Sequence, residues 1–103
     1  MRKAKKTRLE KKGGKVGTTQ EFLGLSEEEA AYIEVRLRLA AALRKRRQQE
    51  RLSQTELAGQ IGSSQSRVAK MEAGDPSVSL DLLVRSLLAL GASQKDVAKV
   101  IAS

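Results

Sequence analysis

Polar side chains that can hydrogen-bond a ligand gather between positions 54 and 70 of the chain. A glutamine amide offers a donor and an acceptor together, which suits the edge of adenine. Serine supplies a short hydroxyl, and lysine or arginine supplies a positive charge for a phosphate or for the edge of guanine. The residues of this kind are Gln54, Ser64, Gln65, Ser66, Arg67 and Lys70. Their shared chemistry is reversible binding to an anionic surface that forms hydrogen bonds.

The composition of the chain excludes most enzyme chemistry. Its 103 residues include no Cys and no His, so it has no thiol nucleophile, no thiolate metal site and no imidazole base. We therefore expect no enzyme, no metal and no cofactor. No apolar run reaches the roughly 18 residues of a membrane-spanning helix, and we expect no membrane partner. The net charge of +8 favours an anionic partner, with nucleic acid the first candidate.

The positive charge is concentrated in two blocks. Residues 1–20 hold eight basic residues and one acidic residue, and they contain few apolar side chains. We predict that they form a disordered basic tail, which serves as a DNA-binding arm, as a partner-binding segment or only as a solubilising leader. The second block either borders the ligand or complements a helix dipole. It includes Arg44, Lys45, Arg46 and Arg51.

Serine caps and glycine stops divide residues 21–103 into five predicted helices. The first runs from about Ser26 to about Gln49 and opens with a capping box, in which Ser26 and Glu29 bond each other's backbone N–H. The later helices begin after Ser53, Ser64, Ser79 and Ser93, and glycine stops follow at Gly62, Gly74 and Gly91. Because no strand pattern is present, we predict an all-α five-helix bundle in one domain, residues 21–103.

The apolar positions predict a core and, in addition, apolar side chains that the core does not need. The predicted inner stripe of the first helix is Tyr32, Val35, Leu39, Ala42 and Leu43, and a second apolar set is Ile33, Leu37 and Ala40. A helix that is apolar on two sides has two neighbours, so the second set meets a folded-back N-terminal segment, another subunit or a partner protein. Further predicted core residues are Leu52, Leu57, Ala58, Ile61, Val68 and Met71. Residues 80–90 and 97–101 carry more apolar side chains than a small core needs, which favours a homodimer seam.

The stretch SQTELAGQIGSSQSRVAKMEAG, residues 53–74, joins two short helices through a turn that contains glycine. This is the signature of a helix-turn-helix, although the same pattern can serve packing alone. Over residues 35–101 the chain resembles the phage-repressor and Xre-type family of DNA-binding domains. The matching elements are Ser53-Gln54, Glu56-Leu57-Ala58, Ile61-Gly62, Ser64-Gln65 and Met71-Glu72-Ala73-Gly74.

The resemblance implies that a recognition helix, about residues 65–73, enters the major groove of double-stranded DNA. By position, Gln65 and Ser66 then contact base edges, Lys70 contacts guanine or a phosphate, and Arg67 contacts either. Gln54 matches a position that bonds a phosphate.

Ser64 is a helix cap and a candidate phosphate contact. The resemblance also implies a structural ion pair between Arg47 and Glu72. Ser77 and Ser79 match a region that touches the DNA backbone in relatives, but Asp75 has the wrong sign for phosphate.

The segment from Glu21 to Ser26, followed by acidic residues and a long helix, resembles HigA-type antitoxins. This resemblance implies a repressor in the bacterial cytoplasm that binds a DNA operator, with a cognate toxin as a candidate second partner. Residues 21–34 hold five acidic residues and no basic one, which suits a basic toxin. The alternative is an antitoxin that acts mainly by inhibiting its toxin and uses DNA binding only for autoregulation. An RNA-binding protein is disfavoured, because Phe22 and Tyr32 are the only aromatic residues available for stacking.

Overall fold

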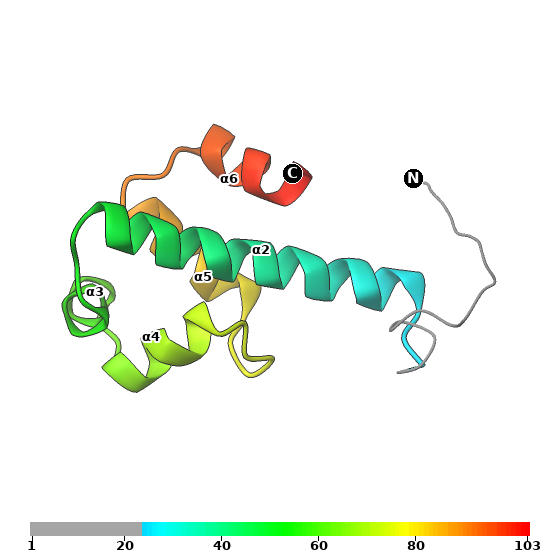
Figure 1. The fold of residues 1–103 in the computed structure, drawn as a ribbon, viewed down its shortest axis with the longest axis horizontal. Helices are drawn as coiled ribbons and strands as arrows, with labels where there is room; N and C mark the ends of the chain where they lie inside the picture. Colours follow the sequence, from blue (N-terminus) through cyan, green and yellow to red (C-terminus); the bar gives the residue numbers. More distant parts are fainter. Residues whose placement is uncertain (1–23) are drawn as a thin grey trace. The chain divides into compact units, whose positions relative to one another are not determined.

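The computed structural model describes residues 24–103, so the predicted tail over residues 1–20 lies outside the described residues. The described part contains five α-helices and no strand (Figure 1). The helices are α2 (Glu27–Gln49), α3 (Gln54–Ile61), α4 (Gln65–Glu72), α5 (Leu80–Ala89) and α6 (Gln94–Ala102). The predicted all-α fold with five helices is therefore confirmed. None of these helices is both long and apolar enough to cross a lipid bilayer.

The chain divides into two compact units, Met1–Tyr32 and Ile33–Ser103, and the division falls within α2. The described part of the first unit begins at Gly24 and contains the first turn of α2. Its capping box is present: the Glu29 N–H donates to Ser26 Oγ at 3.1 Å, and the Ser26 N–H donates to Glu29 Oε1 at 3.0 Å. The predicted boundary of the domain at residue 21 stays a prediction.

In the second unit, serine side chains start four helices in the predicted places. Ser53, Ser64, Ser79 and Ser93 each accept a hydrogen bond from a backbone N–H in the first turn of the following helix. Helix α3 ends at Gly62, whose φ of 66° lies in the left-handed region that glycine adopts without strain. These local hydrogen bonds fix where the four helices begin, and Gly62 fixes where α3 ends.

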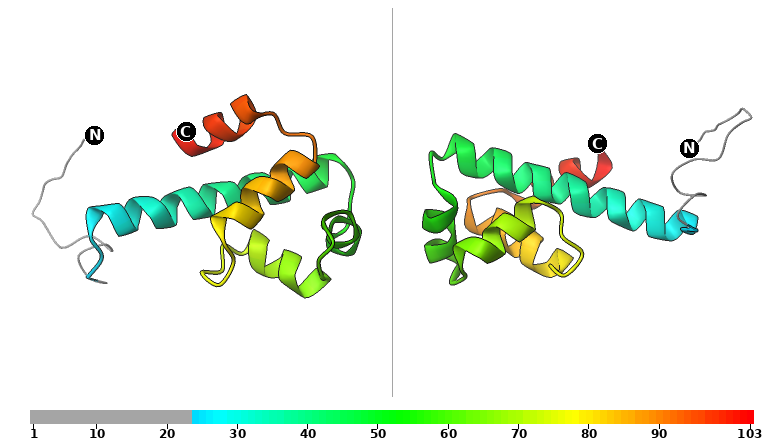
Figure 2. Two further views of the ribbon diagram at one scale, coloured as in Figure 1. Left: turned by 180° about the vertical axis from the view of Figure 1, so that it is seen from behind. Right: turned by 60° about the horizontal axis from the view of Figure 1, so that its bottom comes forward.

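The core of the second unit joins residues from α2 through α6. Its most deeply buried apolar side chains are Leu39, Leu43, Leu57, Val68, Met71 and Leu83. Helix α3 packs mainly against α4, and α5 also contacts α3 and α6. Seen from behind, α5 crosses α2, and buried residues of both helices belong to the same core (Figure 2). Of the predicted core residues, Leu52 and Ile61 are only partly buried.

The prediction for α2 was wrong at two positions. Tyr32 was placed on the inner stripe, but it falls in the first unit and 47% of it is exposed. Ala40 was placed on the second apolar side, but it is buried in the core. The buried face of α2 is set by positions 36, 39, 40 and 43, one helical stripe that includes a charged residue, Arg36. Ile33 and Leu37 lie outside this stripe and are exposed.

Candidate nucleic-acid interface

Helices α3 and α4 form a two-helix unit whose inner faces are buried. Three side chains on these faces have no exposed surface: Leu57 of α3 and Val68 and Met71 of α4. The chain passes between the two helices through the left-handed Gly62 and the cap residue Ser64. Because the inner faces of both helices are packed in the core, the outer face of α4 has a fixed orientation relative to α3.

Helix α4 exposes the polar side chains that the sequence singled out, three in its first turn and Lys70 in its last turn. Gln65, Ser66, Arg67 and Lys70 are all exposed. The Arg67 N–H donates to Ser64 Oγ at 3.2 Å, and this hydroxyl lies 3.3 Å from Ser66 Oγ. The N-terminal end of α4 therefore exposes two hydroxyls, an amide and the positive charge of Arg67, and Lys70 adds a second positive charge in the last turn.

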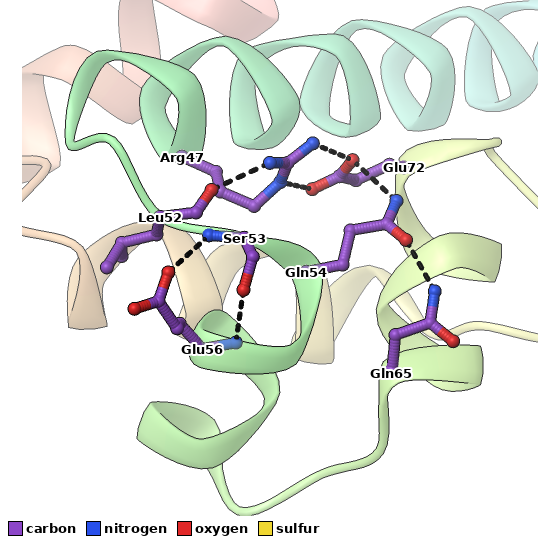
Figure 3. Close-up of polar contacts among 7 residues, drawn as sticks. All are labelled: Arg47, Leu52, Ser53, Gln54, Glu56, Gln65 and Glu72. Atoms are coloured by element: carbon purple, nitrogen blue, oxygen red, sulfur yellow. Dashed lines mark hydrogen bonds and ion pairs between the residues drawn. The ribbon is translucent and has the colours of Figure 1, made fainter.

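A chain of hydrogen bonds connects this surface to the interior (Figure 3). Gln65 Nε2 donates to Gln54 Oε1 at 2.7 Å, and Gln54 Nε2 donates to Glu72 Oε1 at 3.2 Å. The two glutamines come from different helices, so their contact fixes the first turn of α3 against the first turn of α4. Each amide still has one N–H that these bonds do not use.

Arg47 and Glu72 form a bidentate ion pair at the base of this chain. Arg47 Nε lies 2.6 Å from Glu72 Oε2, Nη2 donates to Oε1 at 3.0 Å, and Nη1 donates to the Leu52 carbonyl at 2.8 Å. The side chains are 12% and 4% exposed. The hydrogen bond to Glu72 raises the pKa of Arg47 above its ordinary value, although burial acts in the opposite direction. This pair ties the end of α2 to the end of α4.

A second group of predicted residues lines a pocket beside α4. The pocket has a volume of about 250 Å³ and is lined by Ser64, Ser66, Arg67, Lys70, Ser77 and Val78. Gln54 and Gln65 are not among its lining residues. The structure thus places the predicted residues in two neighbouring sets that share the N-terminal end of α4.

Asp75 lies in the loop between α4 and α5, where its carboxylate has a structural role. Its Oδ1 accepts the Ser77 N–H at 2.8 Å, which closes a turn. The backbone hydrogen bond from Ser77 holds the pKa of Asp75 below its ordinary value, and the Ser77 side chain and the charges of Lys70 and Arg36 act in the same direction. Asp75 therefore shapes the loop that carries Ser77.

Sequence reasoning missed Arg36, which is only 7% exposed. Its Nη1 donates to the carbonyls of Asp75, at 3.2 Å, and of Val78. The available signal was its position: a charged residue in line with Leu39, Ala40 and Leu43 must find hydrogen-bond partners when that face is buried. The predicted second basic block is divided, because Arg46 bonds the Leu90 carbonyl at 3.2 Å while Arg44, Lys45 and Arg51 are exposed.

Comparison with known proteins gives one match. A family model described as a helix-turn-helix domain matches residues 38–100, a range that contains α3, the turn, α4 and α5. No curated protein and no solved structure matches the chain.

Proposed function

The chain belongs to the helix-turn-helix domain family, and from this premise we propose that it is a regulator of transcription that binds double-stranded DNA. The observation that carries the proposal is the contrast between the two faces of α4. Val68 and Met71 are completely buried, whereas Gln65, Ser66 and Lys70 are exposed. A recognition helix requires this arrangement, because its N-terminal residues must reach base edges while its back is held by the scaffold.

The proposed roles divide into base readout and backbone contact. Gln65 and Ser66 contact base edges, and the free N–H and carbonyl of Gln65 suit adenine. Lys70 contacts guanine or a phosphate, and Arg67 contacts either. Gln54 and Ser64 contact phosphates, which position the protein without reading the sequence. The spare N–H of Gln54 supports this role, because its other bonds hold the amide in one orientation.

We further propose that the protein is an Xre-type repressor that acts as a homodimer in the bacterial cytoplasm and catalyses no reaction. Leu88 of α5 and Ile101 of α6 are 44% and 40% exposed, and burial of these side chains in a two-fold seam would be favourable. Two recognition helices in such a dimer would meet half-sites about one helical turn apart.

The experiment is a selection of binding sites from random-sequence duplex DNA with the full chain. The proposal predicts enrichment of a motif with two related half-sites, which footprinting upstream of the protein's own gene then locates. A pool that stays random while the protein binds every duplex with equal affinity would contradict sequence-specific regulation.

A second candidate function is an antitoxin that acts mainly by binding a toxin. It is supported by Ile33 and Leu37, which are 39% and 51% exposed on α2 next to the acidic Glu34. We expect Ile33→Lys to break a complex with a basic toxin encoded by an adjacent gene while leaving DNA binding intact. Co-purification of the two coexpressed proteins measures this, and an unchanged complex would exclude this face.

A further inference from the structure

Arg36 is a charged residue at a position where an apolar residue would satisfy packing. It lies on the buried stripe of α2 and is only 7% exposed. A buried guanidinium is costly unless hydrogen bonds compensate for lost hydration. Arg36 Nη1 donates such hydrogen bonds to the carbonyls of Asp75 and Val78. These two residues are the ends of a four-residue loop segment, residues 75–78. Arg36 therefore fixes the backbone of that loop.

The same loop is held against α2 at a second point. Gly74 has a φ of 72°, and a Cβ added there would lie 2.6 Å from Leu37 Cδ2. The left-handed φ favours glycine at this position, and the close atom belongs to the end of the exposed Leu37 side chain. Arg36 thus bonds the loop that follows α4, and the neighbouring Leu37 lies beside the residue that precedes this loop, Gly74.

The loop presents Ser77 to the pocket beside α4. Ser77 is exposed and lines that pocket together with Arg67 and Lys70. The Ser77 N–H donates to Asp75 Oδ1 at 2.8 Å, so the backbone conformation at Ser77 does not depend on a ligand. The Ser77 hydroxyl also interacts with Asp75, but a hydroxyl hydrogen can rotate toward an incoming phosphate oxygen.

We propose that Arg36 is a positioning residue for DNA binding: through the carbonyls of Asp75 and Val78 it holds Ser77 against a backbone phosphate that Arg67 and Lys70 attract. This inference rests on the proposed function. Arg36 itself does not touch the DNA. The loop that it holds forms the wall of the phosphate site opposite α4.

A double-mutant cycle on the full chain tests the coupling. Ser77→Ala removes the proposed phosphate contact, and in the wild-type background it should weaken binding to duplex DNA by about five- to tenfold. In an Arg36→Met background the loop keeps its internal bonds but loses its two hydrogen bonds to α2, so the same Ser77→Ala change should cost less than about twofold. In an Arg36→Lys background Ser77→Ala should again cost nearly as much as in the wild type. The reason is that a single nitrogen of Arg36, Nη1, donates to both carbonyls, and lysine also offers a single nitrogen. Fluorescence anisotropy with a labelled duplex, well below the melting temperature, gives each dissociation constant.

Arg38→Met is the matched control. It removes the same charge from the same helix, but Arg38 donates to the Ile101 carbonyl at 3.2 Å and pairs with Glu34 at 3.4 Å instead of holding the loop. In this background Ser77→Ala should keep its full cost. If Arg36→Met does not fold, Arg36→Gln replaces it, because the glutamine amide is too short to reach both carbonyls.

Three results are distinguishable. An equal cost of Ser77→Ala in the wild-type and Arg36→Met or Arg36→Gln backgrounds would overturn the inference and leave Arg36 with a role in stability only. No cost of Ser77→Ala in the wild-type protein would overturn it as well. Absence of duplex DNA binding by the wild-type protein would instead overturn the proposed function.

Discussion

Glu72 is the residue on which the candidate interface depends most. It accepts from Arg47 and from Gln54, and Gln54 in turn accepts from Gln65. A negative side chain near DNA opposes binding by simple electrostatics, but here it orients the groups proposed to bind DNA. Effects of substitution along this chain should be non-additive, because its members share hydrogen bonds.

We predict that Glu72→Ala weakens DNA binding and lowers stability. The change leaves the nearly buried Arg47 without its carboxylate, which should reduce the free energy of unfolding by about 3 kcal/mol. Thermal unfolding and DNA titration measure the two effects. Glu50→Ala is the control, because it removes the same charge at an exposed position. Tighter DNA binding with an unchanged melting temperature would show that the ion pair has no positioning role.

Ser86 gives the opposite prediction for stability. Among the described residues its buried hydroxyl has no hydrogen-bond partner, and the residue is 1% exposed. Ser86→Ala should therefore raise the free energy of unfolding by about 1 kcal/mol. Ser79→Ala in the same helix should lower it by about 1 kcal/mol, because Ser79 caps the Leu82 N–H at 3.1 Å. Urea titrations of both variants check the two signs, and a destabilised Ser86→Ala protein would mean that the hydroxyl is bonded.

At the scale of the elements, helix limits could be predicted because they depend on neighbours in the sequence. The bonds of Ser53, Ser64 and Gly62 span only a few residues, so residue type and spacing were enough. Arg36 could not be assigned a role in the same way, because its partners lie 39 and 42 residues away. Arg51, in the turn between α2 and α3, has a φ of 59°, a conformation that its residue type disfavours, and nothing in the sequence predicted it.

The capping box of α6 predicts how stability responds to acid. A hydrogen bond from the Ser93 backbone holds the pKa of Asp96 below its ordinary value, and the charges of Arg46 and Lys99 add to this. A lowered folded pKa means that the contribution to stability is complete above the unfolded value near 4 and is lost as pH falls through the folded value. Asp96→Asn should flatten the decrease in unfolding free energy below about pH 4. Superimposable pH curves for the two proteins would contradict this.

At the scale of the whole molecule, the family match covers residues 38–100, and the chain's +8 charge is suited to binding an anionic polymer. The base-contact set could be proposed from sequence because a recognition helix uses its first turn. The link from Gln65 through Gln54 to Glu72 could not be derived from spacing, because it depends on how α3 packs against α4. A dimer seam is likewise a property of packing, and it stays a prediction.

We predict a two-fold dimer held by α5 and α6. Sedimentation at micromolar concentration should give a mass near twice the 11.2 kDa of one chain. Leu88→Glu should shift the protein to monomer, because it places a charge in the proposed seam. Ile33→Glu, at another exposed apolar position, should not. A monomeric wild-type protein both with and without operator DNA would rule out the dimer.

The central claim is that the first turn of α4 reads base edges, and the specificity ratio of Gln65→Ala tests it most directly. The ratio compares the dissociation constant for random duplex DNA with that for the selected site at one salt concentration. Loss of a base contact costs about 1–3 kcal/mol, so the ratio should fall by roughly 5- to 150-fold. Gln60→Ala, at an exposed position of α3, should leave it unchanged. A specificity ratio that Gln65→Ala does not alter would contradict this placement of the recognition helix.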